Sequence, residues 1–202
     1  MENTTILRKR LHVRSEAMKI SIILLLFLMI LPITAGCTVT NKYDSYFGKV
    51  IDGETKQPIE GAAVLIIYNT EQYGLAGSVS YFADAQETLT DKNGEFKIPA
   101  MRIYKFRVLS GWERYTGVRI FKPGYGCYPK HKYAEPHFDW SSLPPNQYVT
   151  IELPRLKTRE ERLENEGCFP VGVPDDRMKK LIELNNIESV DLGLQPTHIR
   201  RK

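Results

Sequence analysis

Short apolar runs separated by turn residues dominate the chain from residue 46 onward. The pattern predicts seven strands, over residues 46–51, 62–68, 87–90, 95–98, 103–109, 117–121 and 147–153. Alternation is clearest in the last run, where Val149, Ile151 and Leu153 point to one side. No long helical pattern separates these runs, which argues against a parallel sheet built from βαβ units. We therefore expect an all-β domain, a β-sandwich of seven strands.

Two connections between the expected strands are unusually long. The first, residues 69–86, is rich in Tyr, Gly, Ala and Ser, and we expect a loop that covers one edge of the sandwich or contributes to a binding face. The second, residues 124–146, carries two histidines, five aromatic residues and four prolines. Its rings suit either stacking on a carbohydrate or a partner protein, or packing over the core. The candidate binding residues in it are Tyr128, His131, Tyr133, His137 and Trp140.

The second connection also contains groups that can bind a divalent metal. His131, Glu135, His137 and Asp139 fall on one side of the chain if that segment is extended. Pro136 interrupts a regular strand, however, and the spacing matches no metal motif. H-x-x-E, G-x-S-x-G and phosphate-loop motifs are absent from the sequence. We therefore predict a non-enzymatic protein without metal or cofactor, and keep a metal site or enzyme built on this loop as the alternative.

The N-terminal segment has the three parts of a secretory signal peptide. A basic cluster at residues 8–14 and Lys19 precede an uncharged run, residues 20–33, which leads into small residues. As a helix this run rises about 21 Å, which is shorter than the roughly 30 Å core of a bilayer. We expect residues 1–36 to be removed, with Met18 as an alternative start, and keep an uncleaved membrane anchor as the other reading.

The positive charge of the chain is concentrated in the same segment. Five of the 28 basic residues and two of the 24 acidic residues precede Cys37, which leaves 23 basic and 22 acidic residues from there onward. A nearly neutral remainder removes the main argument for a nucleic-acid partner. We therefore expect no nucleic acid among the partners.

The end of the apolar run, Thr34-Ala35-Gly36-Cys37, resembles the lipobox of bacterial lipoproteins. Thr34 departs from the family, which more often has Leu there. The resemblance implies that the Cys37 thiol receives a diacylglycerol, that the chain is cleaved before it, and that acyl chains such as palmitate tether residues 37–45 to a membrane. In this family an Asp after the cysteine tends to retain the protein in the inner membrane. Residue 38 is Thr, so the resemblance implies a cell-envelope protein on the outer membrane, facing the periplasm.

Three later stretches resemble the carboxypeptidase regulatory-like domain. They are GKVIDGETKQPIEGAAV at residues 48–64, TLTDKNGEFKI at residues 88–98 and VRIFKPGY at residues 118–125. The family motifs G-x-V-x-D, T-x-x-P-I, T-x-T-D-x-x-G-x-F and Gly-Tyr occur there in the family's order. The resemblance implies a transthyretin-like β-sandwich, related in architecture to immunoglobulin domains, over residues 46–155.

The motif positions have structural explanations. Pro58 presets the φ angle of a turn, and Gly61 and Gly94 accept backbone angles that a Cβ atom resists. Asn93-Gly94 suits a tight hairpin between the runs at 87–90 and 95–98. These motifs therefore specify a fold rather than a reaction. The apolar motif positions expected in the core are Val50, Val64 and Phe96.

Two cysteines, Cys127 and Cys168, remain if Cys37 is lipidated. An exported protein meets conditions that permit disulfides, so we predict that these two pair, with two buried thiols as the alternative. The tail, residues 156–202, contains a helical stretch ended by Gly167 and a second that begins at Pro174. The second helix either packs on the sandwich or docks the protein onto an envelope complex. Its shared face holds Met178, Leu181, Ile182 and Asn185.

Overall fold

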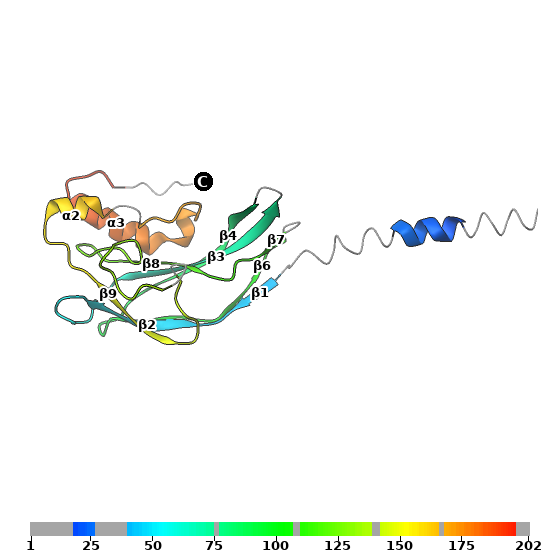
Figure 1. Cartoon of the computed structure of the whole chain (residues 1–202). Helices are drawn as coiled ribbons and strands as arrows, with labels where there is room; N and C mark the ends of the chain where they lie inside the picture. Colours follow the sequence, from blue (N-terminus) through cyan, green and yellow to red (C-terminus); the bar gives the residue numbers. More distant parts are fainter. Residues whose placement is uncertain are drawn as a thin grey trace, which may run out of the picture.

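The computed structural model describes residues 18–26, 40–74, 77–106, 110–138, 142–165 and 168–196 (Figure 1). Strands dominate these ranges. The nine strands found there are β1 (Thr40–Tyr43), β2 (Tyr46–Asp52), β3 (Ala63–Gly74), β4 (Gly77–Leu89), β5 (Glu95–Ile98), β6 (Met101–Tyr104), β7 (Ser110–Trp112), β8 (Gly117–Phe121) and β9 (Tyr148–Leu153). The helical elements after them are α2 (Arg159–Glu164), the 3₁₀ turn η2 (Asp175–Arg177) and α3 (Lys179–Asp191).

Hydrogen bonds arrange the strands in three sheets. β2 is the centre of a three-stranded sheet, with β5 antiparallel on one side and β9 parallel on the other. β3 is the centre of a larger sheet, because β4 pairs along one edge while β8 and β7 share the other. β1 and β6 form a separate two-stranded ribbon.

Alternate residues of β3 face two different layers. Val64 and Ile66 are buried in the core shared with the three-stranded sheet, to which Ile151 of β9 also belongs. Leu65 and Ile67 point the other way, into a second core formed with the helical tail. Two facing sheets around one core are consistent with a β-sandwich, and the tail adds a third layer on the outer face of the β3 sheet (Figure 1).

The helical tail packs closely on that outer face. Leu181 and Ile182 of α3 are buried in the same cluster as Leu65. The Glu87 carboxylate of β4 accepts hydrogen bonds from the backbone N–H groups of Lys180 (2.8 Å) and Leu181 (2.6 Å). A carboxylate at the first turn satisfies otherwise unpaired N–H groups and favours the helix dipole. Packing on the sandwich is therefore the role seen for the apolar face of the tail.

The helix bounds differ from the sequence prediction. Residues 175–177 form the separate turn η2, so α3 begins at Lys179 rather than at Pro174. The first helix begins with a capping box, in which the Thr158 hydroxyl and the Glu161 carboxylate each accept the other residue's backbone N–H. It ends at Glu164, and Gly167, where its end was expected, lies outside the described residues.

The expectation of a loop over residues 69–86 is wrong. β3 and β4 form one long antiparallel hairpin whose register runs from Ala63 opposite Leu89 to Gly74 opposite Gly77, with an irregularity between Tyr68 and Asn69. The strands were not recognised in the sequence because residues 69–86 include many polar side chains and show no continuous apolar pattern. Thr70 nevertheless is buried, and the ladder pairs the backbone polar groups that the two strands turn toward each other.

Two strands were not expected. β1 lies inside the segment predicted as a tether, and its Tyr43 is buried against Tyr68, with ring centroids 4.4 Å apart. β7 is three residues long, too short for alternation to be visible. The strand expected over 103–109 is instead β6, which ends at Tyr104, and residues 107–109 lie outside the described ranges.

The turn at Asp91 to Gly94 connects two sheets. A hairpin was expected between its flanking runs, but β4 pairs with β3 and β5 pairs with β2. Gly94 has a φ angle of +76°, as expected for this position. A Cβ atom at Gly94 would lie 2.4 Å from the carbonyl oxygen of Val50, so only glycine fits where the turn crosses the three-stranded sheet.

The N-terminal region is described only over residues 18–26, which are helical. None of the described helices is long and apolar enough to cross a bilayer. Cys37, with the predictions attached to it, lies outside the described residues.

Candidate functional site

Residues of two sequence motifs meet at the buried carboxylate of Asp52, which ends β2. Its Oδ1 accepts hydrogen bonds from the backbone N–H groups of Glu54 (2.8 Å) and Thr55 (3.0 Å). Its Oδ2 accepts from the Tyr125 hydroxyl (3.1 Å) and from Nε of Arg155 (3.1 Å). The Asp52 of the first motif is thereby joined to the Tyr125 of the third, and both carboxylate oxygens are occupied within the fold.

These contacts set the charge state of Asp52. Burial alone acts to raise its pKa, but the hydrogen bonds from Thr55, Glu54 and Tyr125 and the charge of Arg155 outweigh burial. The net effect holds the pKa of Asp52 below its usual range. Asp52 is therefore an ionised structural anchor at neutral pH rather than a general acid.

Thr90 joins the first motif to the second in a similar way. Its buried hydroxyl accepts a hydrogen bond from the Ala62 N–H (2.8 Å) and donates one to the Ile59 carbonyl (2.7 Å). Val50, Val64 and Phe96 are buried in the common core, as predicted. The motif residues seen in the structure thus hold the fold together, which is the role that the sequence suggested for them.

The connection over residues 124–146 is partly core and partly surface. Tyr128 is fully buried, and its hydroxyl donates a hydrogen bond to the Pro136 carbonyl (2.8 Å), so it is not available to a ligand. Tyr133 is 65% exposed, and Nζ of Lys132 lies 4.7 Å from the centre of its ring. His137 is exposed beside Glu135, with Nε2 3.5 Å from Oε1. Trp140 lies outside the described residues.

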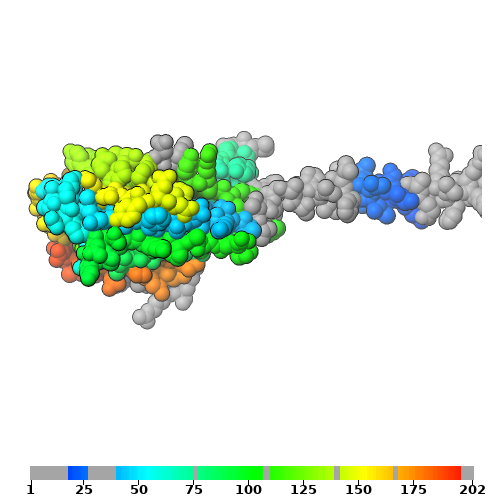
Figure 2. Space-filling model, turned by 90° about the horizontal axis from the view of Figure 1, so that it is seen from below, coloured from blue at the N-terminus to red at the C-terminus, as the bar shows by residue number. Residues whose placement is uncertain are grey.

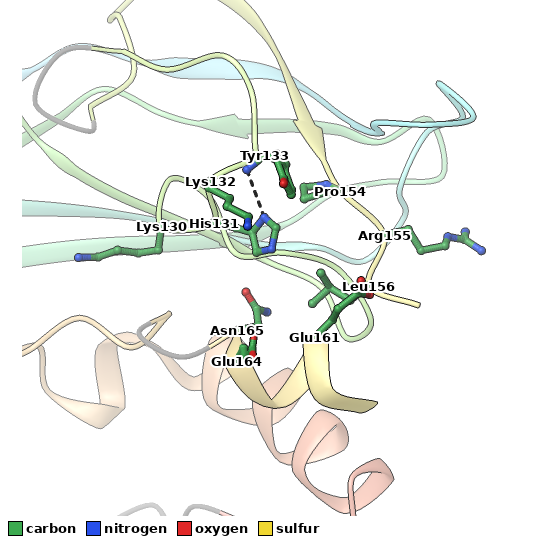
Figure 3. A pocket seen from close by; sticks show the side chains of 10 residues that line it. All are labelled: Lys130, His131, Lys132, Tyr133, Pro154, Arg155, Leu156, Glu161, Glu164 and Asn165. Carbon is green, nitrogen blue, oxygen red and sulfur yellow. Dashed lines mark hydrogen bonds between the residues drawn. The ribbon is translucent and has the colours of Figure 1, made fainter. Parts of the chain in front are cut away.

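The exposed part of this connection lines a cavity of about 580 Å³ beside α2 (Figure 3). One wall is the turn at residues 130–133, and the other is formed by residues 154–156, which follow β9, and by α2 with its C-cap Asn165. His131 and Tyr133 lie on the first wall, whereas Leu156, Glu161 and Asn165 lie opposite them (Figure 3). The cavity is mixed in character, with basic side chains on the turn and carboxylates on the helix.

Local hydrogen bonds hold the cavity walls in place. The His131 N–H donates to the Cys127 carbonyl (2.7 Å), and His131 Nδ1 accepts from the Tyr133 N–H (3.3 Å). Burial and the charge of Lys132 lower the pKa of His131, so its ring is neutral near pH 7. Asn165 donates from its amide nitrogen to the Tyr125 carbonyl (3.0 Å) and accepts from the Cys127 N–H (3.0 Å).

The four proposed metal ligands are not seen gathered together. Within the described ranges, no group of three or more His, Cys, Asp or Glu side chains is placed to hold a metal ion. His131 contacts Tyr133 at the cavity, whereas His137 contacts Glu135. Asp139, the fourth candidate ligand, lies outside the described residues.

Cys127 and Cys168 lie at disulfide distance, with their sulfurs 2.06 Å apart, as their predicted pairing requires. Both residues are buried in the core between the β3 sheet and the tail. The bridge joins the long connection to the segment that follows α2, and the Asn165 hydrogen bonds tie the end of α2 to the same connection.

One wall of the cavity is predictable from the sequence, and the other is not. His131 and Tyr133 were candidates, and the structure places both there. Glu161, Glu164 and Asn165 were missed because they lie in a segment that read only as a charged helix. The predicted cysteine pair was the one available signal, since it implies that the helix lies beside the connection.

Comparisons with known proteins do not add to this description. When compared with models of protein families, with curated proteins and with solved structures, the chain matches none of them.

Proposed function

We propose that this protein is a lipid-anchored, non-enzymatic protein of the cell envelope that presents a transthyretin-like β-sandwich as a binding module. The observation that carries the proposal is the short distance in sequence between the lipobox-like cysteine and the folded body. Cys37 closes the apolar segment, and β1 begins only three residues later, at Thr40. An acyl group on Cys37 would hold the domain directly at a membrane surface, on the periplasmic face of the outer membrane.

Incorporation of labelled palmitate tests the anchor. The wild-type protein, expressed in a bacterium, should take up the label and sediment with the membranes. Cys37→Ser should abolish the label and leave the longer, uncleaved chain, because the lipid is attached to the thiol before cleavage in the family that the segment resembles. The double variant Cys127→Ser/Cys168→Ser is the matched control and should keep the label. An unlabelled wild-type protein would refute the proposal.

The binding role rests on the cavity beside α2. Its lining offers an exposed ring at Tyr133, a cationic group at Lys132 and a carboxylate at Glu164. An exposed ring among polar groups suits a carbohydrate or a polar segment of an envelope protein. The motif residues described above, such as Asp52 and Thr90, are engaged within the fold. We therefore assign the binding role to the cavity rather than to the motif residues.

Photocrosslinking in intact cells tests the cavity. A photoreactive phenylalanine analogue replaces Tyr133 in one strain and Tyr148 of β9, which is also exposed, in another. We expect a discrete adduct with an envelope protein or a glycan only from position 133. Equal adducts from both positions, or none from position 133, would contradict a binding role for this cavity.

A second candidate function is docking onto an envelope complex through α3. The solvent-facing side of this helix exposes Ile187 and Val190, and a shallow cavity of about 580 Å³ lies beside them. Substitution of both residues by Ser should leave folding unchanged because they are exposed. Loss of a co-purifying envelope protein from that variant, but not from Tyr133→Ala, would favour docking over binding in the cavity.

Metal or enzyme chemistry on the His131/His137 loop remains the alternative to a binding module. Metal analysis of the purified protein after dialysis separates the two. The binding-module proposal predicts less than stoichiometric zinc, unaffected by His131→Ala or His137→Ala. One equivalent of zinc that is lost in either variant would overturn it in favour of a metal site.

A further inference from the structure

The β1–β6 ribbon has two faces of opposite character. Directly opposed residues of an antiparallel pair point to the same side. The pairs Asn41–Ile103 and Tyr43–Met101 lie on the inner side, where Tyr43 and Ile103 are buried in the core. The pairs Thr40–Tyr104 and Lys42–Arg102 lie on the outer side, and these four residues are exposed. The outer face therefore carries an aromatic ring and two cations.

Within the described ranges, the cations of this outer face have no acidic partner. Lys42 and Arg102 are opposite each other in the register, and neither forms an ion pair with a carboxylate of the described residues. Lys105, which follows β6, likewise forms no ion pair with a carboxylate in the part of the chain that the structure describes. Like charges directly across a ladder destabilise the pairing. An anionic surface lying against the ribbon would offset this repulsion.

Exposed rings lie at the end of the ribbon where the chain enters the domain. Tyr104 is opposite Thr40 and 67% exposed, and Phe106 two residues later is 72% exposed. The far end of the β3–β4 hairpin lies at this same end of the molecule in both views and exposes Tyr73 and Val79 (Figures 1 and 2). Aromatic side chains beside cations are the composition of protein surfaces that sit at the headgroup level of a bilayer.

The covalent chain limits how far this end can be from an acylated Cys37. Three residue steps separate Cys37 from Thr40, and a fully extended chain spans about 3.5 Å per residue. Thr40 is therefore within roughly 11 Å of the Cys37 backbone, a short distance beside the roughly 40–45 Å thickness of a whole bilayer. Tyr104, its cross-strand neighbour, must lie close to the same surface.

We propose that the outer face of the β1–β6 ribbon, with Lys105 and Phe106, is a membrane-contact surface that binds anionic phospholipid headgroups. This inference rests on the proposed lipidation of Cys37. The lipid attaches the protein to the membrane, and contact between the ribbon and the headgroups orients the domain on it. In that orientation the ribbon end faces the bilayer and the α2–α3 tail, which lies on the other side of the β3 sheet, is left accessible to partners.

Site-specific photocrosslinking to lipid tests this orientation in the full acylated protein. The protein is reconstituted in vesicles containing phosphatidylglycerol, and a photoreactive analogue replaces Phe106 or, as a matched control, the fully exposed Val171 of the tail. Mass spectrometry then counts phospholipid adducts. We expect adducts at position 106 to exceed those at position 171 several-fold. Arg102→Glu should lower the yield at position 106, as should replacing the anionic lipid by phosphatidylcholine.

The outcomes separate the orientation from the anchor. An acylated protein that yields equal adducts at positions 106 and 171 would overturn the membrane-contact surface while leaving the lipid anchor in place. Yields at position 106 that do not change with lipid charge or with Arg102→Glu would overturn the headgroup binding. A purified protein without an acyl mass on Cys37 would overturn the proposed function itself.

Discussion

The β1–β6 ribbon and the α2–α3 tail are both additions to the same pair of sheets, but their charged side chains are arranged differently. Opposite charges are paired in the tail, whereas like charges face each other in the ribbon. In the tail, Arg162 of α2 binds Glu188 of α3 through two hydrogen bonds of 2.7 Å each. The Glu188 carboxylate also accepts from the Gly124 N–H (2.9 Å). In the ribbon, Lys42 and Arg102 lie opposite each other without an acid among the described residues.

This difference indicates which of the two regions makes its contacts within the chain and which is suited to contact a partner. The tail is joined to the body by the cysteine pair, by the Glu87 carboxylate at the start of α3 and by the ion pair of Arg177 with Asp84. The charged side chains of Arg162, Glu188 and Arg177 are paired within the chain, so these contacts hold the tail on the body. The ribbon presents uncompensated cations and exposed rings, which fit a partner outside the chain.

Removing the cysteine pair should have the largest effect on stability. The two residues are separated by 41 positions, and closing a loop of that length stabilises a fold by about 4 kcal/mol in the chain-entropy model. Chemical denaturation of Cys127→Ser/Cys168→Ser, compared with the wild type, measures the loss. A variant as stable as the wild type would mean that the tail needs no covalent attachment.

The buried ion pair of the tail should have the next largest effect. Glu188→Ala removes both hydrogen bonds that the partly buried Arg162 makes to this carboxylate, and we expect a loss of about 2–3 kcal/mol in the free energy of unfolding. Asp191→Ala is the matched control, since Asp191 also contacts Arg162 (3.2 Å) but is exposed, and should cost about 0.5 kcal/mol. Similar losses in the two variants would contradict the view that Glu188 joins the helices to the body.

Acid should reduce the contribution of Asp52. Asp52→Asn removes an acceptor for Tyr125 and Arg155, and we expect it to cost about 1–2 kcal/mol at neutral pH. Because folding lowers the pKa of Asp52, this contribution is present in full above the ordinary aspartate pKa of about 3.9 and is lost as pH falls through the lower folded value. Denaturation of both proteins between pH 7 and pH 2 measures it, and a difference that does not shrink in acid would contradict the assignment.

The smallest effect should have the opposite sign. Arg102→Glu places an acid opposite Lys42 and removes a like-charge pair, so the domain should gain about 0.2–1 kcal/mol. Thermal denaturation of the protein in detergent measures the gain, with Lys97→Glu on β5 as a control for the change in net charge. A destabilised variant would mean that Arg102 has a partner within the fold, and the ribbon would then resemble the tail.

The strands with strong alternation were predictable from the sequence, and the polar hairpin was not. The bounds of β5 and β8 match the prediction. The second half of β3 carries Thr70 and Glu71, whose hydrogen-bonded ladder with β4 is a long-range property that apolar periodicity does not report. β1 was not predicted either, because Tyr43 is its one buried residue and a single apolar position shows no periodicity.

The candidate site was predicted only as far as its aromatic residues extend. His131 and Tyr133 stood out in the sequence, and both line the cavity. Tyr128, equally prominent, is instead in the core, because composition cannot distinguish a ring that packs from one that binds. The second wall depends on tertiary contacts between Asn165 and the backbone of residues 125–127, which no local pattern encodes.

Intact-mass and N-terminal peptide analysis of the protein purified from membranes tests the central claim most directly. The account predicts a mature chain whose first residue is Cys37 and whose N-terminal peptide carries the added mass of diacylglycerol. A mature chain that begins at Met1 or Met18, or a Cys37 peptide of unmodified mass, would contradict it.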